Sequence, residues 1–107
     1  MIVKEIPCKS IRISVEKKGK EIGHVFLQFV RNDLHEKPYG LIEDLFIHEE
    51  FRSQGNSKIL MKKAIDIARM KGCHKLILTS RYGRDKLHEY YESCGFKDHG
   101  KEFRIDF

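Results

Sequence analysis

The 107-residue chain has no tryptophan, only two prolines, three cysteines and no long apolar run, and these shortages exclude several classes of protein. Cys8, Cys73 and Cys94 are odd in number and form no CxxC pair, so we expect free thiols. The six histidines show no zinc-ligand spacing, and no metal is expected. No segment approaches the roughly 20 apolar residues that span a bilayer, and the N-terminus lacks an apolar signal core. We therefore expect a cytoplasmic protein without a membrane partner.

The length is that of one small domain, because chains usually divide into several domains only beyond about 200 residues. Neither a linker nor a repeat interrupts the chain, so a single domain over residues 1–107 is expected. Hydrophobic residues make up 40% and charged residues 35%, which is enough apolar material for a core and excludes a disordered chain.

The formal charge of +5 lies entirely in the second half of the chain. Residues 1–54 carry 9 Lys and Arg against 9 Asp and Glu, whereas residues 55–107 carry 12 against 7. A basic half suits nucleic acid, an anionic membrane or an anionic small molecule. These cations are spread among apolar positions without a dense run or interleaved aromatics, so no nucleic-acid partner is expected.

The first half of the sequence has strand patterns. β-Branched and apolar residues alternate over 11–16 and 22–30 around a glycine-containing turn at 17–20, which predicts an antiparallel hairpin. The segment GLIEDLFIHEEF, residues 40–51, is apolar on both sides and predicts a strand in the middle of a sheet.

The second half changes period and predicts helices and strands in alternation. Apolar residues recur at helical intervals over 57–71, and a short apolar run over 74–80 predicts the parallel strand of a right-handed crossover. A second helix is predicted from Asp85, as its N-cap, to a stop at Gly95. Alternating apolar residues over 103–107 predict a C-terminal strand.

The junction FRSQGNSKIL passes directly from the predicted central strand into a helix start, with Gly55 at the bend. Such a junction can bind anions, because the first helical N–H groups are unpaired and the helix dipole is positive there. Arg52 and Lys58 would add full positive charges. The alternative is an ordinary strand-to-helix turn capped by Ser57, and the sequence pattern leaves both interpretations open.

Glu43 and Asp44 are adjacent carboxylates inside an otherwise apolar strand. Neighbouring strand residues point to opposite faces, so we expect at least one carboxylate to be directed into the protein or a cleft. A carboxylate withdrawn from water becomes a stronger base and suits general base catalysis. The alternatives are a shorter strand or pairing with lysines at a rim.

Tyr91 lies on the apolar stripe of the last predicted helix, where most tyrosines are core residues. A phenol, with a pKa of about 10, can nevertheless donate a proton to a departing thiolate with a pKa of about 8.5. Tyr90 lies on the same stripe, so the choice between the two stays open. Cys94 ends the stripe and is interpreted as a packing residue and not as a nucleophile.

Together, IEDLFIHEEFRSQGNSKILMKKAIDIA, the LILTS strand and HEYYESCGF resemble the GNAT superfamily of N-acetyltransferases over about residues 11–107. RSQGNS approximates the acetyl-CoA signature RxxGxG/A of that family, and the strand and turn are similar to those of polyamine N-acetyltransferases. The resemblance implies an α/β fold with a mixed central sheet, an antiparallel N-terminal hairpin, a β-α-β-α core and a C-terminal strand. The usual two N-terminal helices are lacking.

The resemblance also implies an activity, which is acetyl transfer from acetyl-CoA to a primary amine by direct attack, without a metal. Glu43 would be the general base and Tyr91 the general acid. A strand backbone would pair with the pantetheine arm, and one of its N–H groups would polarise the acetyl carbonyl. The residues implied for coenzyme binding are Leu45, Phe46, Ile47, Arg52, Ser53, Gln54, Gly55, Asn56, Ser57, Lys58 and Arg84.

Three departures from the family pattern qualify this activity. Ser57 replaces a Gly or Ala, and Arg84 stands where relatives often have Asn and could reach coenzyme phosphates. The missing helices normally wall the acceptor site, so an open site for a protein or peptide amine, or a homodimer that completes it, is implied. The alternative is a catalytically inactive coenzyme A-binding or protein-interaction module of the same fold.

Overall fold

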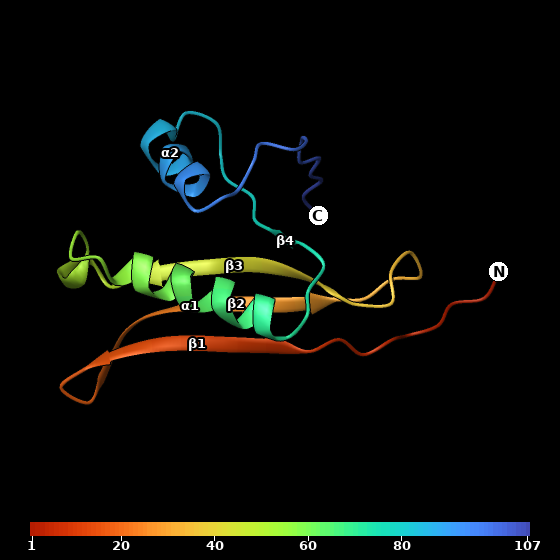
Figure 1. Ribbon diagram of the computed structural model, residues 1–107, viewed down its shortest axis with the longest axis horizontal. Coiled ribbons are helices and arrows are strands. Elements are labelled where there is room, and N and C mark those ends of the chain that lie inside the picture. Colours follow the sequence, from red (N-terminus) through yellow and green to blue (C-terminus); the bar gives the residue numbers. More distant parts are fainter.

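Four strands form one mixed sheet in the order β1-β2-β3-β4 in the computed structural model, which describes all residues 1–107 (Figure 1). The first three strands are antiparallel, and β4 pairs parallel to β3. The strands are β1 (Ser10–Lys17), β2 (Lys20–Val30), β3 (Tyr39–Ile47) and β4 (Leu76–Ile77). The helices are α1 (Asn56–Met70) and α2 (Asp85–Ser93), and a short 3-10 helix, η1 (Glu49–Phe51), precedes α1.

The β1–β2 hairpin is confirmed, and its turn shows why it forms. Lys17 pairs with Lys20, so only Lys18 and Gly19 lie in the loop. Both have positive φ angles, of 53° and 76°. Two consecutive left-handed residues form the turn whose twist matches that of the flanking strands.

A bulge interrupts β3 at the two carboxylates. Phe26 of β2 faces Glu43 of β3. Two residues back along β2, His24 faces Phe46, which is three residues beyond Glu43, so β3 contains one extra residue. Asp44 lies there with a φ of 52°, in the left-handed region. A bulge breaks the alternation of side chains, and both carboxylates are exposed, so the expectation that one is directed inward is wrong.

The core lies between one face of the sheet and α1. Alternate residues of β2 point toward α1 and are buried, and the apolar face of the helix covers them. Each such side chain contributes about 1.5–3 kcal/mol on burial. The buried residues of this cluster are Val25, Leu27, Phe29, Ile42, Ile47, Leu60, Met61, Ala64 and Ala68. The predicted helix over 57–71 is therefore confirmed as α1.

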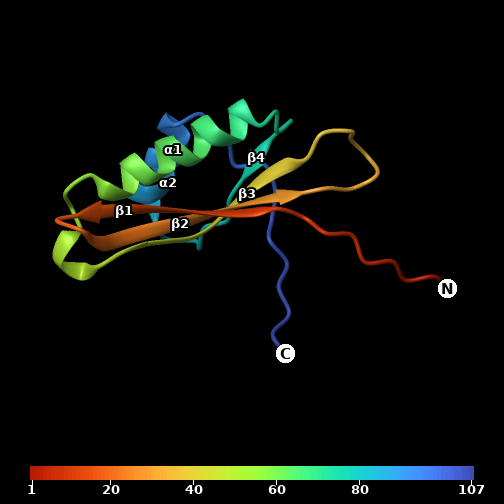
Figure 2. The ribbon, with the colours of Figure 1, turned by 90° about the horizontal axis from the view of Figure 1, so that it is seen from below.

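The two helices are placed differently relative to the sheet. α1 lies over the sheet, and α2 lies beyond β3, on the side where β4 joins (Figure 1). No helix precedes β1, and none covers the opposite face of β1 and β2 (Figure 2). The expected mixed sheet with an N-terminal hairpin and a β-α-β-α order is present. Neither helix has the length and apolar character needed to cross a bilayer.

The structure of the second half of the chain differs from three local predictions. The strand expected over 74–80 is only two residues long. No strand forms over 103–107, where Phe103 is 90% exposed, because alternation alone cannot hold a strand that no neighbour pairs with. Asp85 begins α2 as expected, but it lies inside the helix and not at the N-cap, where Arg84 makes no side-chain cap bond. The three cysteines are free, as expected.

Gly23 permits the close approach of β2 and β3. A Cβ atom there would press against Ile47 and lie 2.7 Å from the Phe46 carbonyl oxygen. We expect Gly23→Ala to lower the free energy of unfolding by about 1–3 kcal/mol in urea denaturation. Gly100→Ala, whose Cβ meets no atom within 4 Å, should change it by less than about 0.5 kcal/mol. Equal effects would contradict this packing constraint.

Candidate functional site

A cleft of about 690 Å³ lies where the end of β3 meets the start of α1 and the start of α2. Ten of the eleven residues predicted for coenzyme binding line it, from three separate segments of the chain. The exception is Gln54, which lies outside because its side chain contacts Lys17 and the Glu50 carbonyl. Phe51 and Leu87 complete the lining. The structure therefore brings the predicted binding residues together at one place.

The cleft opens because β3 and β4 part. They pair only at Gly40–Leu76 and Leu41–Ile77, after which the β3 edge that faces β4 has no strand partner. The segment Leu45–Ile47 lies in this unpartnered stretch and lines the cleft. Backbone N–H and C=O groups require partners, so this edge can accept an extended ligand in the manner of an added strand.

The turn into α1 presents a row of backbone donors. Ser53 and Gly55 have positive φ angles of 62° and 83°, and Gly55 is the N-cap of α1. No backbone N–H from Ser53 to Lys58 donates to another backbone carbonyl, and no side chain caps the helix. A Cβ at Gly55 would meet no atom within 4 Å, so the turn is open above the glycine. Such a concave row of N–H groups binds anions.

Two side chains anchor this turn to the sheet. Arg52 donates from Nε to the Ile47 carbonyl at 2.8 Å, and its guanidinium lies 5.7 Å from the Phe46 ring centre. The Asn56 side chain is 4% exposed and donates to the Phe51 carbonyl at 3.0 Å. Both predicted ligand residues therefore hold the loop in shape. The alternative in which Ser57 caps the helix is wrong.

The charge in the cleft is of one sign. Arg52, Lys58 and Arg84 line it, and no carboxylate does. Three cations beside free backbone N–H groups produce a positive potential at the helix start. The cleft is therefore suited to a ligand with an anionic group and an extended polar arm.

The predicted general base lies on the uncovered face of the sheet. Glu43 faces Phe26 there and is not among the residues that line the cleft. Beside it, His24 Nε2 lies 2.9 Å from Asp44 Oδ2, and the His24 ring centre is 5.8 Å from the rings of Phe26 and Phe46. Sequence reasoning missed His24, because its partner is 20 residues away and only the register of β2 with β3 joins them.

The two tyrosines of α2 occupy different surroundings. Tyr91 is half-buried, with its ring 6.1 Å from that of Phe96, and burial raises its pKa although Arg84 opposes the shift. Burial, with the neighbouring Cys94, raises the pKa of Tyr90 to about 12. Neither lines the cleft. Both phenols therefore stay protonated at neutral pH and can act only as proton donors.

Comparison with known proteins shows what the chain is similar to. The sequence model of the family described as "Acetyltransferase (GNAT) family" matches residues 5–96. A glucosamine 6-phosphate N-acetyltransferase from Trypanosoma brucei brucei is 37% identical over 67 residues, which are 63% of this chain and 44% of that protein. The chain thus spans less than half the length of this curated relative.

Solved structures share the fold. The crystal structure of a Trypanosoma brucei acetyltransferase is 28% identical, with a TM-score of 0.80 over 92% of this chain and 69% of that one. The glucosamine-6-phosphate N-acetyltransferase from Arabidopsis thaliana is 22% identical, with a TM-score of 0.80 over 92% of this chain and 67% of that one. The second similarity concerns the fold alone.

Burial of Tyr91 predicts a pH dependence of stability. Its pKa is higher in the folded than in the unfolded state, so its contribution is fully present below about pH 10 and is lost as the pH rises further. We expect Tyr91→Phe to make the free energy of unfolding fall less steeply between about pH 9 and 11, measured by urea denaturation. Tyr82→Phe is the control, because Tyr82 is 88% exposed. If the free energy of unfolding falls equally steeply with pH in Tyr91→Phe and in the wild type, burial of Tyr91 does not cause the pH dependence.

Proposed function

Because the chain belongs to the acetyltransferase (GNAT) family, we propose that it transfers an acetyl group from acetyl-CoA to a primary amine. The observation that carries the proposal is the cleft in which free backbone N–H groups from Ser53 to Lys58 meet the unpartnered β3 edge. We also propose that residues 1–107 form one domain.

The cleft has the chemistry to hold the coenzyme. N–H groups of Gly55 and the first turn of α1, with Lys58 and Arg84, would bind the pyrophosphate. A hydrogen bond to a charged group contributes about 1.5–3 kcal/mol, so several of them supply much of the roughly 8 kcal/mol of a micromolar complex. The backbone of Leu45–Ile47 would bind the extended arm and place an N–H at the acetyl carbonyl. Acetyl-CoA itself supplies an activated thioester.

The remaining task is to remove two protons from the amine nitrogen and to add one to the sulfur. An alkylamine is mostly ammonium at neutral pH, and it must lose a proton before its nitrogen can form the bond to the acetyl carbon. We assign that proton to Glu43, which is exposed and therefore acts as a hydrated base and not as a buried one. After the bond to the acetyl carbon has formed, the nitrogen would lose a second proton to water. As the bond from carbon to sulfur breaks, Tyr91 would donate a proton to the sulfur, which leaves a neutral amide and free coenzyme A thiol.

The acceptor would approach the uncovered face of β1 and β2, where no helix lies. The curated relative acts, by its name, on glucosamine 6-phosphate, so this amino sugar and not a polyamine is the first acceptor to test. The open face also fits a protein amine, or a homodimer in which a second copy completes the wall. A second candidate function, coenzyme A binding without catalysis, is favoured by one observation: neither Glu43 nor Tyr91 lines the cleft.

Calorimetry and a thiol-release assay test the activity. We expect saturable acetyl-CoA binding at micromolar concentration, and release of free thiol when glucosamine 6-phosphate is added. Binding without thiol release for sugar, peptide and protein amines would favour the inactive module. A folded sample that binds no acetyl-CoA at low salt would refute both functions.

Paired variants test the assignment of the base. Glu43→Gln should lower kcat by more than about tenfold while the acetyl-CoA Kd changes by less than about twofold. Asp44→Asn is the matched control, because it removes the adjacent carboxylate isosterically, and it should lower kcat by less than about threefold. A larger loss of kcat in Asp44→Asn than in Glu43→Gln would assign the role of general base to the His24–Asp44 pair.

A further inference from the structure

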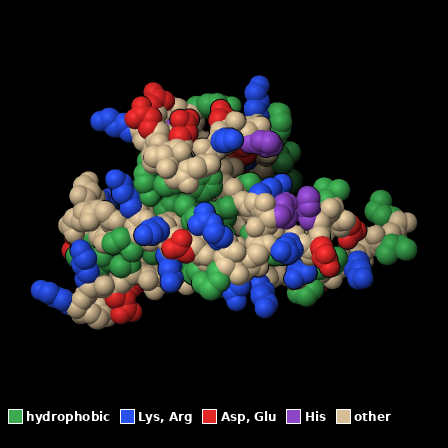
Figure 3. All heavy atoms as spheres, in the orientation of Figure 1, with side chains coloured by type: hydrophobic (Ala, Val, Ile, Leu, Met, Phe, Trp, Pro, Cys, Tyr) green, Lys and Arg blue, Asp and Glu red, His purple; other side chains and the backbone are tan.

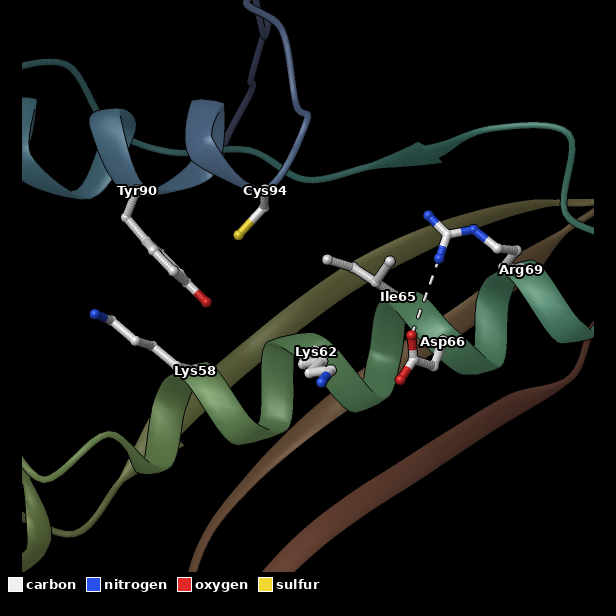
Figure 4. A pocket seen from close by; sticks show the side chains of 7 residues that line it. All are labelled: Lys58, Lys62, Ile65, Asp66, Arg69, Tyr90 and Cys94. Atoms are coloured by element: carbon white, nitrogen blue, oxygen red, sulfur yellow. Dashed lines mark ion pairs between the residues drawn. The ribbon is translucent and has the colours of Figure 1, made fainter.

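The two faces of the sheet carry different side chains near the cleft. On the helix side, Lys and Arg side chains gather over α1 (Figure 3). A groove of about 390 Å³ between α1 and α2 includes Lys58, Lys62 and Arg69 in its lining (Figure 4). Lys58 also lines the cleft, so the groove and the cleft form one basic depression. On the uncovered face, by contrast, the strand that forms the wall of the cleft is joined to its neighbour by an acidic residue and a histidine, Asp44 and His24.

Asp44 is the only non-glycine residue inside a strand that has a left-handed backbone, with a φ of 52°. This conformation is unfavourable for a residue with a Cβ atom, although Asp adopts it more readily than most. The Asp44 side chain is exposed, so packing does not hold it in place. A residue keeps such a conformation only where its surroundings stabilise it, and these residues often lie at functional sites.

His24 provides a fixed partner for Asp44 on β2. Its Nε2 lies 2.9 Å from Asp44 Oδ2, and an ionised carboxylate can only accept, so Nε2 donates the hydrogen bond. The His24 side chain is 16% exposed, and its ring centre lies 5.8 Å from the rings of both Phe26 and Phe46. The ring would lose both aromatic contacts if it turned away. Because Asp44 has no partner in the register of β2 with β3, this side-chain bond ties the bulge to β2.

The bulge determines which backbone groups of β3 face the cleft. Before the bulge, the Gly40 N–H donates to a carbonyl next to β4, so even-numbered residues are directed toward the β4 edge. After the bulge, the His48 N–H donates to a carbonyl of β2, so even-numbered residues are directed away from that edge. The extra residue therefore turns the N–H and C=O groups of Ile47 toward the cleft. The Ile47 carbonyl accepts the hydrogen bond from Arg52 there, which agrees with this direction.

Loss of the bulge would reverse this arrangement. The backbone groups of Phe46 would then face the cleft, and those of Ile47 would face β2, so that Arg52 would lose its acceptor. The conformation of one residue, Asp44, thus controls the direction of every backbone group that follows it along the cleft.

We propose that His24 is a positioning residue, which acts through its hydrogen bond to Asp44. The bond holds the bulge, and the bulge directs a backbone N–H group of the segment Leu45–Ile47 to the carbonyl oxygen of the acetyl group. This inference rests on the proposed function, because it assumes that the acetyl group of acetyl-CoA lies at this segment. It gives His24 a role in which no proton is transferred to or from a substrate.

Two pairs of variants separate the hydrogen bond from the side chains that form it. His24→Phe keeps an aromatic ring beside Phe26 and Phe46 but has no donor, whereas its match, His24→Gln, keeps a donor near the position of Nε2. Asp44→Ala removes the acceptor and disfavours the left-handed conformation. Its match, Asp44→Gly, also removes the acceptor but permits that conformation. Asp44→Asn keeps an acceptor and tolerates the conformation, so a small effect is expected there.

The carbonyl stretching band of bound acetyl-CoA, labelled with carbon-13 at that carbonyl, reports the hydrogen bond without any acceptor amine. Infrared difference spectroscopy should show the band at higher frequency in His24→Phe and Asp44→Ala than in the wild type, because a weaker hydrogen bond leaves a stiffer carbonyl. His24→Gln and Asp44→Gly should leave the band in place. With glucosamine 6-phosphate, kcat should fall about five- to tenfold in His24→Phe and Asp44→Ala, while the acetyl-CoA Kd changes by less than about threefold.

The double variant His24→Phe with Asp44→Gly completes the test. Glycine adopts the bulge conformation without the bond, so the double variant should match Asp44→Gly in its band and stay within about twofold of it in kcat. A band that moves as far in Asp44→Gly as in Asp44→Ala, or that does not move in His24→Phe, would overturn the inference while the proposed function stands.

The proposed function can fail separately. If the wild type binds acetyl-CoA but transfers the acetyl group to no amine, the proposed activity is overturned, and the band still decides the role of His24. Failure of the folded wild type to bind acetyl-CoA would overturn both. Asp44 is exposed, so its two variants keep the test valid if His24→Phe does not fold.

Discussion

The parting of β3 from β4 is the constraint on which the rest of the molecule depends. Parallel pairing stops after Leu41, and the bulge at Asp44 then turns the strand within a few residues. On its other edge β3 pairs with β2 again at Phe46 and Ile47, which holds this part of the strand in the sheet. The cleft is therefore a consequence of backbone geometry, and side chains of Leu45–Ile47 only shape its wall.

The turn at the start of α1 also presents backbone groups to the cleft. Arg52 and Asn56 fix the loop to β3 by hydrogen bonds to carbonyl groups, and this leaves backbone N–H groups to face a ligand. Gly55 permits the left-handed conformation at the helix start. Anion binding thus requires few side-chain functional groups, only a correctly held turn and nearby positive charge.

Local patterns made the hairpin, α1 and the turn at Gly55 predictable from the sequence. In each case a residue or its neighbours determine the geometry, as Gly19 does in the hairpin. The bulge at Asp44 was not predictable, because it depends on the register of two strands and moves Glu43 to an exposed position. The apolar alternation over 103–107 predicted a strand, but strand formation requires a neighbour that this segment does not have. His24 was not predictable as a site residue for the same reason, because its partner, Asp44, comes from another strand.

The charge asymmetry of the sequence has a structural counterpart. Lys58 and Arg84 lie at the cleft, and Lys62 and Arg69 lie along the groove that adjoins it, so part of the basic excess borders two connected depressions. An anionic ligand of some length would use both.

Binding of coenzyme A at the parted strands can be observed directly by two-dimensional NMR of the amide groups. Titration with coenzyme A should shift the backbone amide resonances of Leu45–Ile47 and of Ser53–Lys58 more than any others, because both segments would exchange water for the ligand. Shifts confined to the uncovered face of β1 and β2, with the turn at Gly55 unchanged, would contradict the placement of the coenzyme in this cleft.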